Sequence, residues 1–530
     1  MFRFFALILA GAGLTSSLLA APRDPAPAAA SIDREIDNRL AEAKLPASPI
    51  ADDSEFLRRV VLDITGRIPT LEKTIAFLDS KDPDKRRKLI DELLAGKEYG
   101  QHHAAVWRNL LAPPGNPVKG KAPPDRFSPW LAEQFNRDRS WDQIVTDLLT
   151  TEGDIQKVPE SGFVMANTEN FHPQANRLAA SSARMFLGLR LGCAECHDHP
   201  FAAWKQTDFW NMAAFFGRLR NTGKKGPPFI LTEDPDLQPP HKDDPEKIKA
   251  APGGGIVLPL STGKSSGKIV QARLLGGEEM KLDDDKPFRP IFTAWLTAKE
   301  NPYFAPAYVN RVWSQFFGRG FVNPVDDFRE GNAASHPELL KLLADEFRAS
   351  GHDCKHLIRC ICNSQAYQRT SQPLPENERD CGLFSHMAVK ILSAEAFYDS
   401  LATLNAIFKN GTAQPNADKL EPRNDFAQFF RPQGESDDEN QFRQGIPQFL
   451  KRLNGATFNQ GSPLIDRLLR AGADRSKIIE GLYLATLSRK PSPDEIELMS
   501  KYLDRRSSAE KGYAGVLWIL VSSGEFALNH

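Results

Sequence analysis

The sequence predicts a mainly α-helical protein whose two helical domains are joined by a Pro/Gly-rich connector that contains a small β element. Apolar residues recur at helical spacing before residue 220 and after residue 286, which is typical of amphipathic helices. Proline, glycine and charged residues dominate the stretch between them, as at a domain boundary. A chain of 530 residues is also too long for one compact core. We therefore expect a signal peptide at residues 1–21, domains at 22–220 and 286–530, and a connector at 221–285.

Composition and charge narrow the class of protein. Hydrophobic residues make up 41% and charged residues 25% of the chain, which excludes a disordered chain and a membrane protein with many spans. The net charge of −1 leaves no basic excess for binding phosphate backbones, so we expect no nucleic-acid partner.

The N-terminus has the layout of a secretory signal peptide. Arg3 precedes an apolar run at residues 4–14, and the small residues Ala20 and Ala21 suit a cleavage site. No later segment has 18 consecutive apolar residues, so we expect no transmembrane span after the signal peptide is removed. The sequence therefore predicts export to the periplasm or the cell surface, where disulfides and covalent haem can both form.

Helix-start and helix-stop signals support the helical elements. Near the N-terminus, an apolar run at helical spacing ends at Gly66. Ser140 with Gln143, and Ser335 with Glu338, have the spacing of capping boxes at helix N-termini. In the connector, the stretches GIVLPL and GKIVQARLLGG read as short strands.

The stretch CAECH at residues 193–197 is the strongest chemical signal in the chain. Covalent attachment of haem c needs two thiols that bond to the porphyrin vinyl groups and a histidine directly after the second thiol, which ligates the iron. Cys193, Cys196 and His197 match this pattern in a chain that is predicted to be exported. The pattern favours haem c as the cofactor, held by Cys193 and Cys196 and ligated by His197.

Two other interpretations of the motif stay open. The C-x-x-C spacing also suits a redox-active dithiol or a structural disulfide, in which case no cofactor is implied. Alternatively, Cys193, Cys196, His197 and His199 could hold a bare zinc or iron ion, provided that an extended loop lets both histidines reach it.

The residues around the motif offer a haem pocket and a sixth iron ligand. Met212 lies on a predicted helix that begins after an Asp208 N-cap, and it is one option for the sixth ligand, although a role in the core is the commoner fate of such a residue. The other options are Met165, Met185, His172 and His199. The apolar residues that could line a haem pocket, and that would equally suit any helical core, are Phe186, Leu187, Phe201, Trp204, Phe209, Met212, Phe215 and Phe216.

Other candidate sites are weaker. The GKSSG sequence at residues 263–267 has the letters of a nucleophile elbow but lies in a hairpin-like context. Asp326 and Asp327 next to Arg329 suggest a salt-bridged turn. The cysteines of the C-terminal half, which are Cys354, Cys360, Cys362 and Cys381, are predicted to be structural. One disulfide that involves Cys354 or Cys381 is an option. No catalytic set stands out, so the sequence alone assigns no enzyme activity.

Four long stretches resemble a paired family of secreted planctomycete proteins of unknown function. They begin DSEFLRRVV, GCAECHDHPF, NPYFAPAYVN and LYLATLSRKP, and the likeness runs from about residue 30 to 528. The first half is similar to the planctomycete cytochrome-c-like domain of the second type, and the second half is similar to the planctomycete secreted domain of the first type. Positions that match the family's motifs are Cys193, Cys196, His197, Asp198, His199, Pro200 and Phe201 in the first half, and Asn310, Arg311, Trp313, Phe317, Gly318 and Asp327 in the second.

The resemblance implies a connection to cytochromes but no known activity. Many relatives carry an additional N-terminal cytochrome module that this sequence lacks. If those modules pass electrons to one another, this protein would need a separate cytochrome or redox partner. The leading hypothesis is an exported c-type haem protein for redox or electron transfer. The alternatives are a non-enzymatic surface or binding protein with a structural or redox-active cysteine pair, and hydrolysis assisted by a bare metal ion.

Overall fold

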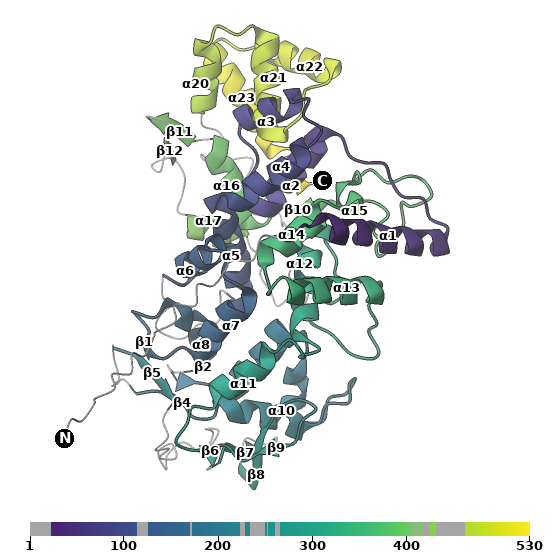
Figure 1. Ribbon diagram of the computed structural model, residues 1–530. Helices are drawn as coiled ribbons and strands as arrows, with labels where there is room; N and C mark the ends of the chain where they lie inside the picture. The colour runs from purple at the N-terminus through teal and green to yellow at the C-terminus, as the bar shows by residue number, and fades with distance from the viewer. Residues whose placement is uncertain are drawn as a thin grey trace, which may run out of the picture.

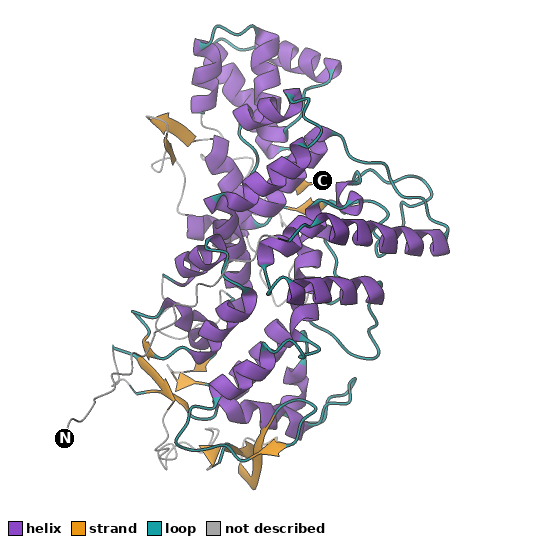
Figure 2. Cartoon of the chain, viewed as in Figure 1, coloured by secondary structure: helices purple, strands orange, loops and turns teal. Residues whose placement is uncertain are grey.

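The structure is a computed structural model that describes most of the chain. The described residues are 23–113, 126–169, 172–222, 228–233, 250–251, 253–259, 265–404, 406–409, 412–415, 423–430 and 462–530. These residues form an elongated, mainly helical body with a few small sheets, as the sequence predicts (Figures 1 and 2). The C-terminal helices lie at one end and a small antiparallel sheet lies at the other (Figure 1).

The N-terminal half is built from short helices that follow one another closely. In chain order they are α1 (Ala26–Ala43), α2 (Asp53–Thr65), α3 (Leu71–Asp79), α4 (Lys85–Ala95), α5 (Lys97–Leu111), α6 (Phe127–Asn136), α7 (Trp141–Thr150), α8 (Gly162–Ala166), α9 (Ala175–Ser182) and α10 (Gln206–Ala213). Short turns of other helix types also occur: η1 (Pro159–Ser161), the π-helical η2 (Ala183–Leu187), η3 (Leu191–Glu195) and η4 (Ala214–Phe216). The segment from α9 to α10 carries the CAECH motif.

Small antiparallel sheets accompany the helices. β1 (Gly153–Asp154), β5 (Ile230–Glu233) and β4 (Leu219–Asn221) form one sheet in that order. A second sheet has the order β6 (Ala250–Ala251), β7 (Gly255–Pro259), β8 (Ser265–Arg273) and β9 (Glu279–Met280). Two-stranded pairs are β2 (Thr168–Glu169) with β3 (His172–Pro173), β10 (Lys390–Ile391) with β13 (Leu528–Asn529), and β11 (Ala406–Lys409) with β12 (Thr412–Pro415).

Helices dominate again after the sheets. They are α11 (Arg289–Leu296), α12 (Phe304–Phe317), α13 (Pro337–Ala349), α14 (Cys354–Cys362), α15 (Gln365–Gln368), α16 (Ala394–Leu404), α17 (Arg423–Phe430), α20 (Pro463–Arg470), α21 (Arg475–Leu487), α22 (Pro493–Asp504) and α23 (Ala509–Ser522).

Helix caps agree only in part with the sequence. Helix α2 ends at Thr65, and Gly66 follows in the left-handed conformation (φ 66°) that suits glycine, as predicted. Ser140 is the N-cap residue of α7, but its side chain makes no capping hydrogen bond. The predicted capping box of Ser335 is wrong: α13 begins after His336, and the Ser335 hydroxyl pairs with the His336 ring instead (3.0 Å).

The hydrophobic cores join helices from both halves of the chain. One core runs from α1 through residues of α12, α13 and α14. The other packs Leu62 of α2, Ile68 of the following loop and Leu71 of α3 against the C-terminal helices α16 and α20–α23. In Figure 1, α3 accordingly lies among the C-terminal helices.

Buried polar contacts reinforce this junction at α2. The Asp63 carboxylate accepts hydrogen bonds from Lys390 Nζ (2.6 Å), Tyr367 Oη (2.8 Å) and Asn529 Nδ2 (2.7 Å). Lys390 also donates to the carbonyls of Gln315 and Phe316, so both members of the ion pair have further hydrogen-bond partners. These contacts tie the first half of the chain to α12, α15 and the C-terminal strand.

Among the described helices, none combines the length and the apolar character that a bilayer span requires.

Candidate functional site

The CAECH motif lies in a surface loop that α10 holds by its backbone. Cys193 belongs to the 3-10 turn η3, and Cys196 follows it directly. Trp210 Nε1 donates to the carbonyl of Glu195 (2.9 Å), and Gln206 Nε2 donates to the carbonyls of Glu195 and Cys196 (both 3.1 Å). These contacts fix the loop through carbonyl groups and involve neither cysteine side chain.

The three predicted site residues all face solvent. Cys193, Cys196 and His197 are exposed, whereas their neighbours Leu191 and Ala194 are buried and anchor the turn. All six cysteines of the chain lie in the described residues, and each is a free thiol. Cys193 and Cys196 are thus open to reaction and do not form a disulfide brace in this structure.

The hydrogen bonds of the two motif histidines distinguish their ring nitrogens. His197 Nδ1 lies 2.7 Å from the carbonyl oxygen of Asp198, which can only accept, so Nδ1 carries the proton and Nε2 keeps its lone pair. His199 Nδ1 accepts a hydrogen bond from the backbone N–H of Phe201 (3.1 Å), so the neutral ring carries its proton on Nε2. A metal-binding histidine usually donates its second ring nitrogen to a carbonyl or carboxylate. Of the two, His197 has the arrangement of a ligand.

Most of the apolar residues that could line a haem pocket are packed in the helical core, which is the other role that the sequence allows for them. Phe186, Leu187, Phe209, Met212, Phe215 and Phe216 are buried in the core, each at most 2% exposed. Phe292 of α11 packs against the rings of Phe215 (5.7 Å between centroids) and Phe216 (5.2 Å), so the second half of the chain occupies the space next to them. Only Phe201, which is 74% exposed, and the half-buried Trp204 remain at the surface.

Most of the candidates for the sixth iron ligand are buried. Met165, Met185 and Met212 are core residues, which is the commoner fate considered for them. His172 is exposed in β3, and the N-cap of α10 is Lys205 rather than Asp208. Asp208 instead lies in the first turn, where its carboxylate accepts the backbone N–H of Lys205 (2.8 Å).

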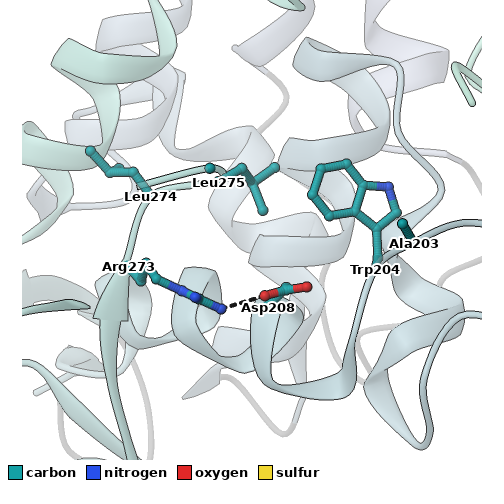
Figure 3. A pocket seen from close by; sticks show the side chains of 7 residues that line it. Ala203, Trp204, Asp208, Arg273, Leu274 and Leu275 are labelled. Atoms are coloured by element: carbon teal, nitrogen blue, oxygen red, sulfur yellow. Dashed lines mark hydrogen bonds and ion pairs between the residues drawn. The ribbon is translucent and has the colours of Figure 1, made fainter. Parts of the chain in front are cut away.

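A small cavity adjoins the motif loop at the start of α10. Its volume is about 230 Å³, and it is lined by Ala203, Trp204, Asp208, Arg273, Leu274, Leu275 and Gly276. Figure 3 shows Trp204 and Leu275 along one side and the ion pair of Arg273 with Asp208 along the other. Pockets that enclose a drug-sized ligand usually hold about 300–1,000 Å³. This cavity cannot enclose a macrocycle, although it could hold a small group at the edge of the loop.

A loop from the second half of the chain reaches the motif. Phe328 donates its backbone N–H to the carbonyl of Gly188 (2.9 Å), and a Cβ on Gly188 would lie only 2.6 Å from the Phe328 ring. The buried Asp326 carboxylate binds Arg190 Nε (2.9 Å) and Arg184 Nε (2.5 Å). The predicted salt-bridged turn is confirmed for Asp327, whose oxygens lie 3.0 and 3.1 Å from Arg329 Nε. The role of Asp326 between the two halves was not visible in the sequence.

Comparison with known proteins identifies both halves. Residues 31–221 match the family model PSCyt2, a protein of unknown function (DUF1549), and residues 289–460 match PSD1, a protein of unknown function (DUF1553). The chain belongs to the family that pairs these two domains. No curated protein and no solved structure matches the chain. The CAECH loop lies in the PSCyt2 domain, and the loop around Asp326 lies in the PSD1 domain.

The buried Asp326 makes the contact between the two domains sensitive to acid. Burial alone would raise the pKa of Asp326, but Arg184, Arg311 and Arg190 outweigh it and hold the pKa below its ordinary value of 3.8. A carboxyl whose folded-state pKa is lowered stabilises the fold above its unfolded pKa, and this contribution is lost as the pH falls through the folded value.

The Asp326→Asn variant is therefore expected to unfold more easily at neutral pH. We expect the free energy of unfolding to fall by about 1–3 kcal/mol at pH 7, because two partly exposed arginines lose a charged partner. Urea unfolding at pH 7 and pH 3 tests this, and the difference from the wild type should shrink at pH 3. Asp345→Asn, at an exposed ion pair on α13, is the control and should stay within about 0.5 kcal/mol. A constant difference at both pH values would contradict the assignment.

The PSD1 cysteines of α14 are structural, as predicted, but the optional disulfide is not formed. Cys354, Cys360 and Cys362 are buried, and burial raises the pKa of Cys354 and Cys360 to about 12. Cys381 is exposed and Cys354 is buried, and neither thiol is paired. Cys360 Sγ and Glu346 Oε1 both contact the same atom, His356 Nε2 (3.5 and 2.7 Å). A nucleophile and an orienting acid would use opposite nitrogens of the ring, so this cluster is not a catalytic triad.

Two remaining candidates can be placed in this structure. Across the described residues, no group of three or more Cys, His, Asp and Glu side chains is arranged to hold a metal ion, so the set of Cys193, Cys196, His197 and His199 is not gathered around one point. In the GKSSG sequence, Ser265, Ser266 and Gly267 begin β8, which pairs antiparallel with β7, so the hairpin context is confirmed. Gly263 and Lys264 lie outside the described residues.

A larger cavity, of about 1,040 Å³, lies between α2–α4 of PSCyt2 and the C-terminal helices. No cysteine or histidine is among the described residues that line it, and Arg467 with Glu72 and Lys73 with Glu92 form ion pairs there. The motif loop is therefore the candidate functional site.

Proposed function

We propose that this chain is an exported redox protein that carries a c-type haem on its PSCyt2 domain. The observation that carries the proposal is the state of the CAECH side chains: two exposed free thiols next to an exposed His197 whose Nδ1–H is fixed on a carbonyl. This donor set supports covalent haem attachment, because both thiols are exposed and unpaired and Nε2 of the exposed His197 keeps its lone pair.

Cys193 and Cys196 would form the covalent links. Each thiol adds its S–H across one vinyl C=C bond, so that a C–S bond forms and the proton goes to the neighbouring carbon. The addition gains and loses no electrons overall, and it requires both sulfurs as thiols, which is their state in this structure.

His197 would be the proximal ligand through Nε2, while the Asp198 carbonyl fixes the ring tautomer. When bound, haem supplies an iron centre that exchanges one electron. Because the adjoining cavity is small and most nearby aromatic residues are buried elsewhere, this site would leave the cofactor largely exposed to water. Such exposure favours transfer of electrons to a separate redox partner over chemistry in an enclosed pocket.

The second candidate function is a surface protein with a redox-active cysteine pair. The free, exposed state of Cys193 and Cys196 supports it as well, because accessible thiols at C-x-x-C spacing can cycle between dithiol and disulfide. Under this alternative the mature protein has no porphyrin mass, and two additional thiols become titratable after reduction.

The test is to express the full chain from Met1 in a bacterial host that has a cytochrome c maturation system. We expect a Soret band that survives acid–acetone extraction and an intact mass increased by one haem. In His197→Ala, the yield of haem protein should fall severely, and the Soret band of the remainder should shift because the axial imidazole is lost. His199→Ala is the matched control and should keep the wild-type spectrum. A wild-type protein without porphyrin mass would overturn the proposal in favour of the cysteine pair.

A further inference from the structure

Arg329 of the PSD1 domain lies beside the end of the motif loop. Its guanidinium carbon is 6.0 Å from the centroid of the Phe201 ring, and Phe201 follows His197 by only four positions. The Arg329 side chain is 31% exposed and the Phe201 ring next to it is 74% exposed, so both border solvent.

One side of the Arg329 guanidinium is already held. Nε contacts both oxygens of Asp327, and Asn332 Nδ2 donates to the Asp327 carbonyl (2.9 Å), which stiffens the turn. The two Nη nitrogens form no hydrogen bond or ion pair with any residue in the described part of the chain. A guanidinium that is oriented through Nε presents these nitrogens as a fork, the geometry that binds a carboxylate with two hydrogen bonds.

The position of Arg329 relative to the motif is set by contacts on the residues that precede it. Phe328 packs against the bare backbone of Gly188, and Asp326 binds Arg190, which lies three residues before Cys193. Gly188 has a φ of 68°, which a residue with a side chain adopts only with strain, so both conformation and space require glycine there. The PSD1 loop is therefore attached before the motif at Gly188 and Arg190 and contacts Phe201 after it.

We propose that Arg329 binds a propionate carboxylate of the haem, so that residues of both the PSCyt2 and the PSD1 domain form the site. The inference rests on the proposed haem attachment. A porphyrin carries carboxylates on short flexible arms, and the Arg329 fork offers two donors to one of them. The exposed Phe201 ring beside it offers an apolar surface to the edge of the macrocycle. The positive charge of Arg329 would then favour the ferrous over the ferric state, because ferric iron carries one more positive charge.

The experiment compares the haem-loaded full chain with Arg329→Gln, Arg329→Lys and Asp327→Asn. Arg319→Gln is the matched control, because Arg319 is an exposed arginine of the same domain. Spectroelectrochemical titration gives the ferric-to-ferrous ratio at each applied potential. In Arg329→Gln we expect this ratio to rise three- to tenfold at a fixed potential, and tenfold corresponds to about 59 mV for one electron. Arg329→Lys should restore most of the charge effect, and Asp327→Asn should give an intermediate shift because the fork is no longer oriented.

The outcomes separate this inference from the proposed function. If wild type and all variants carry covalent haem but Arg329→Gln titrates like Arg319→Gln, the propionate contact is wrong and haem attachment stands. If wild type carries no haem, both proposals fail. Far-ultraviolet circular dichroism of each variant checks that the shift does not come from unfolding.

Discussion

The double variant Cys193→Ala, Cys196→Ala is expected to carry no haem that survives acid–acetone extraction. Both thiols are exposed and free, and the loop that presents them is fixed by Trp210 and Gln206 through its carbonyl groups. Removing the sulfur atoms therefore leaves the fold of the loop intact and removes only the atoms that could bond to vinyl carbons. We expect complete loss of the porphyrin mass and an unchanged midpoint of urea unfolding for the apoprotein.

The single variants and one control make this result specific. Cys193→Ala or Cys196→Ala should retain a haem with one thioether bond, which shifts the α-band of the reduced pyridine complex relative to the doubly bonded form. Cys381→Ser removes an exposed thiol in the PSD1 domain and should leave the haem content unchanged. Equal haem content in the double variant and the wild type would show that the porphyrin is held elsewhere or non-covalently.

Local patterns predicted the helical architecture well, because helix periodicity and glycine stops are properties of short stretches. The apolar face of α2 that the sequence shows, from Phe56 to Ile64, is buried throughout, and α2 ends where Gly66 requires it. The motif residues were likewise identified by spacing alone, and the structure places them together on one exposed loop.

Contacts between distant segments could not be predicted from the same patterns. A buried aromatic side chain has the same appearance in the sequence whether it lines a ligand pocket or packs against another helix. The rings of Phe215 and Phe216 are covered by Phe292, which comes more than 70 residues later in the chain. The contact between Arg329 and Phe201 depends on the same kind of long-range packing.

Charged residues of α2 show a second limit of sequence patterns. Arg58 and Arg59 carry charged side chains, yet they are 0% and 1% exposed. Arg59 donates to the carbonyls of Tyr367 and Arg369, and Arg58 donates to carbonyls near the C-terminus. A guanidinium has five donors and can satisfy carbonyls that chain ends leave unpaired, which hydropathy does not register.

Replacing Arg58 by methionine is expected to cost about 3–5 kcal/mol of the free energy of unfolding. Its Nη1 donates to Thr486 O (2.9 Å), and its Nη2 donates to Phe526 O (3.0 Å) and Leu528 O (3.2 Å). Methionine fills much of the volume but leaves these buried acceptors without a donor, and each such group carries a desolvation cost. Burial lowers the pKa of Arg58 to about 10, so the guanidinium is charged at neutral pH and its removal also takes away a charge-assisted bond.

Urea unfolding at pH 7, followed by tryptophan fluorescence, measures this cost against two comparisons. Arg58→Lys keeps the charge, but its three donors lie on a single atom and cannot reach carbonyls on both α21 and the C-terminal strand. We therefore expect it to lower the free energy of unfolding by about half as much as the methionine variant. Arg87→Ala on α4, whose ion pairs with Asp84 and Asp91 are 3.6 and 3.8 Å long, should change stability by less than about 0.5 kcal/mol. Because Arg58 joins α2 to the C-terminal segment, its loss should also make residues 475–530 susceptible to proteolysis before the CAECH loop is cut. Simultaneous cleavage of both regions would mean that the two hydrophobic cores unfold as one unit and that Arg58 holds no separate junction.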